Sequence, residues 1–410
     1  MVFTGNNYIN RIEVIKKVNR LFLKYAVLYN FTYMAIGALT PLIGQYLDEL
    51  GFSGAQIGTV TATGTAVAIF ASTFWGKVYS CSRRKYGVLM LLCTAAAAVC
   101  GVFSNMETYL LCAVVFGCMY FFQAPIMSLT DAFTVESIAG RGGFGQLRAW
   151  GAVGFALGVF LAGNLAEKTD VSVIFIFYIG SYLIAAFVVA AIKLQRRRER
   201  DAALKNLSDI KDGRPKRSAG YRDVFRNRRL MQLILCAFFM GGTNVANNTY
   251  FSFLYIEGGG TLAGVGIAML LMVGSEVPFM AWCEKLSRRL TMERLVLISM
   301  CISSGRFILM GIGLPWWMLI IIAASQGAVN GILLIEFVRY SSKLAAAGTE
   351  SLAISTYYIL GSNLSTIVCQ VVGGRILDFA GAWAVYLFFG IFNLAGILLY
   401  IKFRLYRQST

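Results

Sequence analysis

Apolar residues fall along the chain in long runs that are separated by short polar segments and show no alternation of apolar and polar positions. The run from Leu89 to Cys100, for example, contains no charged residue. A bilayer core of about 30 Å needs roughly 20 apolar residues per helix, whereas a membrane barrel shows alternating segments of about ten residues. The pattern therefore predicts membrane-spanning helices, whose backbone polar groups are all bonded within the segment.

Twelve such runs are present, six on each side of a polar region at 194–229. The spans before this region are predicted at 23–47, 54–76, 86–104, 108–136, 144–166 and 172–193. The spans after it are predicted at 230–256, 262–283, 293–313, 316–338, 351–374 and 383–402. We interpret 194–229 as a basic cytoplasmic linker between an N-terminal half at 1–193 and a C-terminal half at 230–410.

Composition narrows the class of protein. Hydrophobic residues make up 58% and charged residues 14% of the chain, against about 45–50% and about 25% in soluble domains. The chain contains no histidine, which excludes zinc sites built on imidazole and Ser-His-Asp or Cys-His catalysis. The sequence shows no paired-carboxylate metal cluster and no phosphate-binding loop, so we expect neither an enzyme nor a cofactor.

The net charge of +17 is distributed unevenly. With twelve spans, nearly all basic residues lie on the side that carries both termini and the linker, and only Arg148, Lys168, Arg306 and Arg375 fall elsewhere. By the positive-inside rule this pattern places both termini in the cytoplasm and the chain in the cytoplasmic membrane. The charge is thus a feature of membrane topology, and we expect no nucleic-acid partner.

A weak internal repeat links the two halves. The segments Phe74–Arg84 and Ala281–Arg289 follow the second and eighth spans, and each contains a Trp, then a Lys, then Ser-Arg-Arg. Equivalent loops in two pseudo-symmetric six-helix halves are typical of the major facilitator fold.

Charged residues inside spans are costly in a membrane and are therefore candidates for function. They are Asp131 in span 4, Arg148 in span 5, Glu276 in span 8 and Arg306 in span 9. In each half the acid and the base can pair across neighbouring helices, either to lock the helices together or to line a central cavity. Glu336 and Arg339 have i,i+3 spacing at the end of span 10, which favours a structural ion pair.

Uncharged polar residues cluster in spans 7, 10 and 11. Amides at helical spacing occur at Asn244, Asn247, Asn248, Gln326 and Asn330. They can bind solute hydroxyls or a carboxylate, or equally connect helices. Tyrosines that can stack on a ligand or simply pack are Tyr29, Tyr33, Tyr357 and Tyr358. Gly154 and Gly158 in span 5 predict close helix packing.

The segment from Thr130 to Gly158 carries an acid in span 4 followed by Phe-Gly-x-x-Arg-x-x-Gly at 144–151. It resembles the branch of the major facilitator superfamily that includes lactose permease-like, phenylpropionate permease-like and nucleoside permease-like transporters. The resemblance covers most of the chain, including Gly274-Ser-Glu276, Ser304-Gly-Arg306 and Val338-Arg-Tyr340.

This resemblance implies roles for individual residues. Asp131 and Arg148 match the pair that holds solute hydroxyls, and Glu276 matches the acid that joins ligand binding to proton movement. Arg306 matches the span 9 arginine of the branch. Departures from lactose permease are Phe155 in place of a stacking tryptophan, Gln326 in place of a histidine and Val329 in place of the proton-carrying glutamate. Any proton coupling therefore falls on Glu276 or Asp131.

We accordingly predict a secondary transporter that moves a small polar solute of the sugar, nucleoside or aromatic acid class by alternating access with proton symport. The expected solute-binding residues are Asp131, Arg148, Phe155, Asn244, Asn247, Asn248, Gln326 and Asn330. The expected coupling residues are Glu276, Arg306 and Asp131. Expected partners are the solute, protons and the lipid bilayer, and we expect a monomer. The alternatives are an uncoupled facilitator or efflux transporter, and a non-transporting membrane sensor or scaffold.

Overall fold

The computed structural model describes residues 5–138, 144–203, 221–345 and 349–406, and in these ranges the chain is helical without a strand. The helices of the first half are α1 (Gly5–Leu39), α2 (Ile43–Glu49), α3 (Gly54–Cys81), α4 (Lys85–Phe103), α5 (Tyr109–Ile138), α6 (Phe144–Lys168) and α7 (Val173–Ala203). Those that follow are α8 (Tyr221–Arg226), α9 (Arg228–Glu257), α10 (Leu262–Leu290), α11 (Met292–Met310), α12 (Trp316–Ala324), α13 (Gln326–Leu344), α14 (Glu350–Thr356), the π-helix η1 (Tyr357–Asn363) and α15 (Leu364–Lys402). Residues 204–220 of the predicted linker lie outside the described residues.

The predicted all-α fold of twelve spans is confirmed. Nine helical segments of the described chain are long and apolar enough to cross a membrane. The last of them, Leu352–Lys402, has 51 residues and breaks at Gly381, whose φ of 78° ends one helix and starts the next, so it supplies two spans. α10 and α11 supply the other two, although their apolar stretches are interrupted by charged residues such as Glu276 and Arg306.

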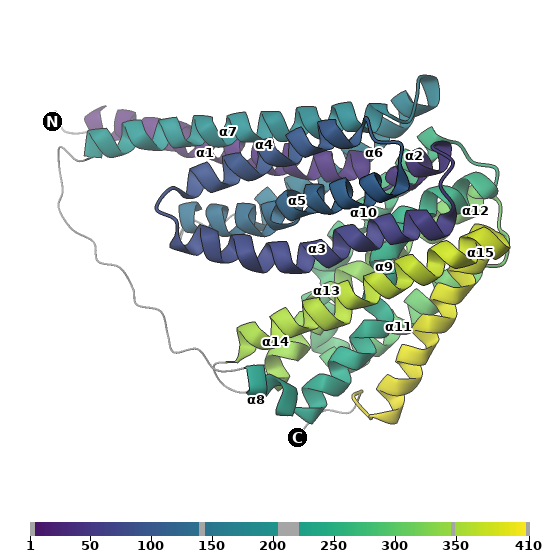
Figure 1. Cartoon of the computed structure of the whole chain (residues 1–410). Helices are drawn as coiled ribbons and strands as arrows, with labels where there is room; N and C mark the ends of the chain where they lie inside the picture. Colours follow the sequence, from purple (N-terminus) through teal and green to yellow (C-terminus); the bar gives the residue numbers. More distant parts are fainter. Residues whose placement is uncertain (1–4, 139–143, 204–220, 346–348, 407–410) are drawn as a thin grey trace.

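The helices form two groups that follow the order of the chain (Figure 1). The purple to teal helices α1–α7 form one group, and the green and yellow helices α9–α15 form the other. The groups meet along two seams, in which α10 packs against α6 and α15 packs against α3. Toward the end that carries α8, α14 and both termini, the two groups diverge.

Glycines allow α1 and α6 to approach each other closely within the first half. A Cβ on Gly154 would overlap the backbone carbonyl of Asn30, and one on Gly158 would overlap that of Met34. Close approach of backbones substitutes for side-chain interdigitation where small residues face a neighbouring helix. The predicted close packing of span 5 at these glycines is confirmed.

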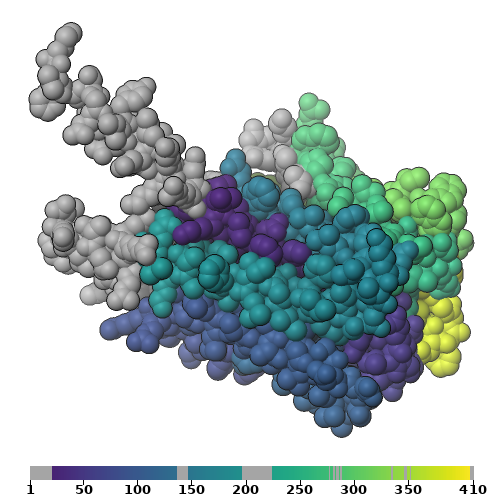
Figure 2. Space-filling view, turned by 90° about the horizontal axis from the view of Figure 1, so that it is seen from above, coloured from purple at the N-terminus to yellow at the C-terminus, as the bar shows by residue number. Residues whose placement is uncertain are grey.

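The outer surface of the helices exposes many large apolar side chains. Figure 2 shows one face of the molecule, which belongs mostly to the first half. Large hydrophobic side chains that are strongly exposed include Leu110, Ile176, Phe187 and Phe379. Such extended apolar exposure suits contact with lipid chains and not with water. The chain is therefore a multi-pass membrane protein.

Hydrogen bonds between the two halves lie in the part of the molecule remote from the termini, among the described residues. The carboxylate of Asp378 accepts from the backbone amides of Gly54 and Ala55, and Glu167 accepts from the amide of Ala263 at 2.7 Å. Deeper in the seam between α3 and α15, Thr61 donates to Gln370 at 3.0 Å. The halves are thus joined at this end, while no such bond joins the described residues near the termini.

Candidate solute-binding site

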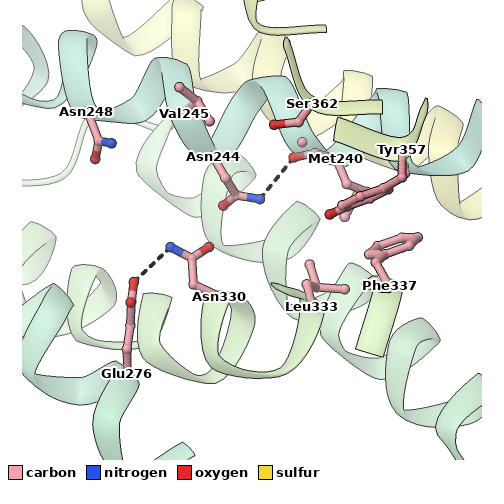
Figure 3. A pocket seen from close by; sticks show the side chains of 12 residues that line it. Met240, Asn244, Val245, Asn248, Glu276, Asn330, Leu333, Phe337, Tyr357 and Ser362 are labelled. Atoms are coloured by element: carbon pink, nitrogen blue, oxygen red, sulfur yellow. Dashed lines mark hydrogen bonds between the residues drawn. The ribbon is translucent and has the colours of Figure 1, made fainter. Parts of the chain in front are cut away.

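A cavity of about 200 Å³ lies at mid-length in the second half, between α9, α10, α13 and η1 (Figure 3). Its polar lining residues are Asn244, Asn248, Glu276, Asn330, Tyr357 and Ser362. Its apolar wall contains Met240, Val245, Leu333 and Phe337. A pocket with a few convergent polar groups and an apolar wall is the usual form of a small-molecule site.

Glu276 is the one charged side chain among the described residues that line this cavity. It lies on α10 and accepts a hydrogen bond from the amide of Asn330 on α13, with a distance of 2.9 Å between Nδ2 and Oε1 (Figure 3). Pro278 lies two residues further along the same helix. The expected solute-binding residue Asn330 and the expected coupling residue Glu276 are therefore direct neighbours.

Arg306 lies behind the cavity and is only 3% exposed. Its Nη1 donates to Oε1 of Gln326 at 2.6 Å, and its Nη2 donates to Oδ1 of Asn244 at 3.2 Å. Its guanidinium also lies 4.4 Å from the centre of the Phe307 ring. The predicted direct pair with Glu276 is absent in this conformation, and Nη1 and Nη2 of the arginine bond amide oxygens instead.

The three asparagines of span 7 separate into two groups. Asn244 and Asn248 are one helical turn apart and line the cavity, whereas Asn247 is fully buried beside it. Asn247 donates to Gln326 at 3.2 Å and accepts from the hydroxyl of Tyr386 at 2.7 Å. Asn247 and Gln326 thus belong to the network around Arg306 and do not line the cavity.

The acid and base of the first half pair as predicted. Nη1 of Arg148 on α6 lies 3.3 Å from Oδ2 of Asp131 on α5, and the arginine side chain is 51% exposed. The hydroxyl of the buried Tyr29 on α1 donates to Oδ1 of Asp131 at 2.7 Å.

The cavity of the second half is not lined by Asp131, Arg148 or Phe155. Phe155 is partly buried against the hydrophobic core, and its backbone lies against Gly37 of α1. The structure therefore places the expected site residues in two regions, one on each half. Near the terminal end, Arg339 and Glu336 form the predicted i,i+3 pair at 3.2 Å.

Several cavity residues had no signal in the sequence. Phe337, Leu333 and Ser362 are ordinary members of apolar or mixed runs, and only the packing of helices turns them toward one space. The ring of Phe337 stacks on that of Tyr357 with centroids 5.8 Å apart and planes inclined by 19°. Together they form an aromatic wall on the side of the cavity opposite Glu276 (Figure 3).

The chemistry of the lining indicates what it can bind. Amide and hydroxyl groups form hydrogen bonds with solute hydroxyls, and an aromatic wall packs against the apolar parts of a solute. The described lining contains no basic side chain that could pair with an anionic solute. In the described part of the chain no group of three His, Cys, Asp or Glu side chains is placed to hold a metal ion.

The relatives that a comparison with known proteins finds for this chain are named as permeases or transporters. The family model described as "MFS_1 like family" matches residues 22–388. The chain is 30% identical to a maltose permease of Geobacillus stearothermophilus, over 91% of this chain and 92% of the permease. It is 23% identical to a probable 3-phenylpropionic acid transporter of Escherichia coli, over 90% of this chain and 93% of that protein.

Solved structures share the fold at low sequence identity. The crystal structure of the nucleoside transporter NupG (D323A mutant) superposes with a TM-score of 0.79 and 16% identity, covering 93% of this chain and 99% of NupG. A bacterial homologue of the lysosomal transporter Spinster, in an inward-facing and unoccupied conformation, gives a TM-score of 0.68 and 13% identity over 95% of this chain and 98% of that one.

Proposed function

Because the chain belongs to the MFS_1 like family of major facilitator transporters, we propose that it carries a small polar solute by alternating access, coupled to protons. The family, the fold and the relatives agree on a transporter in the plasma membrane whose solute is of the sugar, nucleoside or acid type. Substrate choice, coupling and mechanism are the parts that we propose.

One observation carries the proposal: a polar cavity at mid-length of the membrane spans that contains a single carboxylate. Transporters of this architecture place the solute site near the bilayer midplane, between parts that move against each other. The halves are joined at the end remote from the termini, by Glu167 and Asp378 among others, and diverge at the terminal end (Figure 1). We take this as a state open toward the cytoplasm.

Among the three solute classes we favour a neutral, hydroxylated solute, and a sugar first. The amides of Asn244 and Asn248 suit hydroxyl groups, whereas an aromatic acid would find no basic side chain among the described residues of the cavity wall to pair with its carboxylate. The relative that is 30% identical is a maltose permease, which supports the sugar class. A nucleoside is the second candidate, because it too is neutral and hydroxylated.

We assign the proton to Glu276. Its carboxylate meets the solute cavity and is held by the neutral amide of Asn330, so a proton can be added without breaking an ion pair. Asp131 is less suited, because it already pairs with Arg148 and accepts from Tyr29. Binding a neutral solute next to a protonated Glu276 avoids a buried unpaired charge while the site reorients.

The test uses the protein in proteoliposomes with radiolabelled maltose, uridine and 3-phenylpropionate. We expect maltose uptake to be driven by an inward proton gradient in the wild type. In Glu276→Gln we expect exchange of maltose across the membrane to persist while gradient-driven accumulation is lost.

Three outcomes would contradict parts of this proposal. Accumulation that persists in Glu276→Gln removes the coupling role of this residue. Wild-type transport of maltose that only runs downhill, without accumulation under an imposed proton gradient, supports the uncoupled facilitator. Binding of a solute without any transport supports the sensor.

A further inference from the structure

The cavity is bordered by an unusual helix. Residues Tyr357–Asn363 form a π-helix of seven residues between α14 and α15. π-helical turns are rare and are frequently found at functional sites. Here the π-helix contributes Tyr357 and Ser362 to the cavity wall.

The π geometry brings these two hydroxyls to the same wall. In an α-helix, two side chains five positions apart are separated by a rotation of about 500°, so they point in directions about 140° apart. In a π-helix the hydrogen bond joins residues five apart, so Tyr357 and Ser362 lie roughly one turn above each other. An α-helical span 11 would direct only one of them into the cavity.

Packing against α9 holds the wide turn in place. A Cβ on Gly241 would lie 2.5 Å from the carbonyl oxygen of Gly361 and 2.9 Å from Cα of Ser362, so the two backbones touch. One step further, the hydroxyl of Ser365 bridges the amide of Gly242 and the carbonyl of Phe238, two groups that an α-helix bonds directly. The wide turn is therefore part of a defined contact between α9 and span 11.

The polar atoms on this wall have no protein partner. Tyr357 is 7% exposed and its ring is packed on Phe337, yet its hydroxyl points toward the cavity (Figure 3) and makes no hydrogen bond within the described residues. The hydroxyl of Ser362 and the amide of Asn248, within the same described ranges, also make none. Polar groups that converge on one cavity and have no protein partner are the kind of group through which a small-molecule site orients its ligand.

We propose that the π-turn of span 11 is the element that recognises solute hydroxyls, with Tyr357 as the principal donor and Ser362 as the second contact. This inference rests on the proposed transport function and assigns specificity to residues outside the expected site. The solute class is a neutral sugar ring: its hydroxyls meet Tyr357, Ser362 and Asn248, and an apolar part lies on the Phe337 side.

The test compares transport of maltose by the wild type and by Tyr357→Phe in proteoliposomes. Loss of one hydrogen bond to the solute is expected to raise KM about tenfold. A smaller rise is expected for Ser362→Ala. The matched control is Tyr182→Phe, which removes a hydroxyl from a fully buried tyrosine on α7 away from the cavity, and whose KM we expect to be unchanged.

Monodeoxy analogues of maltose identify the bond itself. The wild type should bind one analogue about tenfold more weakly than it binds maltose. The Tyr357→Phe variant should bind this analogue and maltose equally well, because the hydroxyl that would contact the missing group is absent from the variant. Thermal unfolding of each purified variant reports whether it is folded.

The outcomes separate this inference from the proposed function. Wild-type transport of maltose together with an unchanged KM in folded Tyr357→Phe overturns the inference alone. If every analogue loses affinity equally in the wild type and in Tyr357→Phe, the inference is likewise overturned. Absence of both maltose and uridine transport by the wild type overturns the proposed function and, with it, this inference.

Discussion

At the scale of single residues, the amides of the second half have two different roles that the structure separates. Gln326 is 4% exposed and its oxygen accepts from both Arg306 and Asn247. Asn248, in contrast, faces the cavity. Removing a partner from a buried charge leaves that charge unsatisfied, whereas removing an amide that faces a cavity removes a contact with the solute.

We therefore predict that two similar substitutions affect different properties, one the stability of the protein and the other its KM for the solute. Gln326→Leu should lower the free energy of unfolding by about 2–3 kcal/mol, because the guanidinium of Arg306 loses its shortest hydrogen bond. Asn248→Leu should leave stability nearly unchanged and raise KM for the solute. Thermal unfolding in detergent and uptake kinetics measure the two effects. A stable Gln326→Leu protein would show that Arg306 does not depend on this amide.

At the scale of helices, two carboxylates join the halves by capping helices of the opposite half. Asp378 accepts from the first amides of α3, and Glu167 accepts from an amide in the first turn of α10. Amides in the first turn of a helix have no partner within the helix and carry partial positive charge, so a carboxylate is favoured there. Both caps must break before this end of the molecule can open.

We predict that Asp378→Asn combined with Glu167→Gln shifts the population toward the state that is open at this end. Each carboxylate at a helix N-terminus contributes about 0.3–1 kcal/mol, so the shift should be several-fold. Distances between spin labels at Glu107→Cys and Ile312→Cys, in a background without other cysteines, should lengthen in the apo protein.

The matched control is Glu257→Gln. Glu257 caps the amide of Ala382 at 2.7 Å, but both residues belong to the second half. Removing this cap should lower the stability of the second half without lengthening the distance between the labels. An equal shift in the control, or none in the double variant, would show that the caps do not hold the halves together.

At the scale of the whole molecule, the distribution of charge and the shape of the bundle suggest one orientation. The basic loops lie on the side of the termini, which is also the side on which the halves diverge (Figure 1). We propose that this side is cytoplasmic and that the protein acts as a monomer, because each chain contains a complete cavity. Neither proposal depends on the identity of the solute.

Orientation can be measured with a natural cysteine. Cys81 is exposed at the end of α3 on the side of the termini. In a background in which the other cysteines are replaced by serine, we predict that a membrane-impermeant maleimide labels Cys81 in inside-out vesicles and not in right-side-out vesicles. A single cysteine introduced at Glu107, on the opposite side, in a background that also lacks Cys81, should show the reverse. Labelling of Cys81 from the outside would invert the proposed topology.

The sequence by itself determined the class of protein, the helices and their number. Runs such as Leu89–Cys100 are long enough to span a bilayer, and this property is local, because each residue contributes to it without reference to distant parts of the chain. The same holds for Asp131 and Arg148, whose cost inside a span is apparent from their position alone. Their pairing followed from adjacent spans that pack together.

Only the tertiary structure decided which polar groups meet. Asn244 and Asn247 are three residues apart on one helix, yet Asn244 lines the cavity whereas Asn247 is buried against Gln326 and Tyr386, because the rotation of α9 against its neighbours sets the boundary between them. Arg306 likewise met amides instead of Glu276. The π-turn that aligns Tyr357 with Ser362 depends on contact with α9 and leaves no mark in the local sequence. Periodicity specifies what a helix can bury, but the rotation and crossing of packed helices decide what it touches.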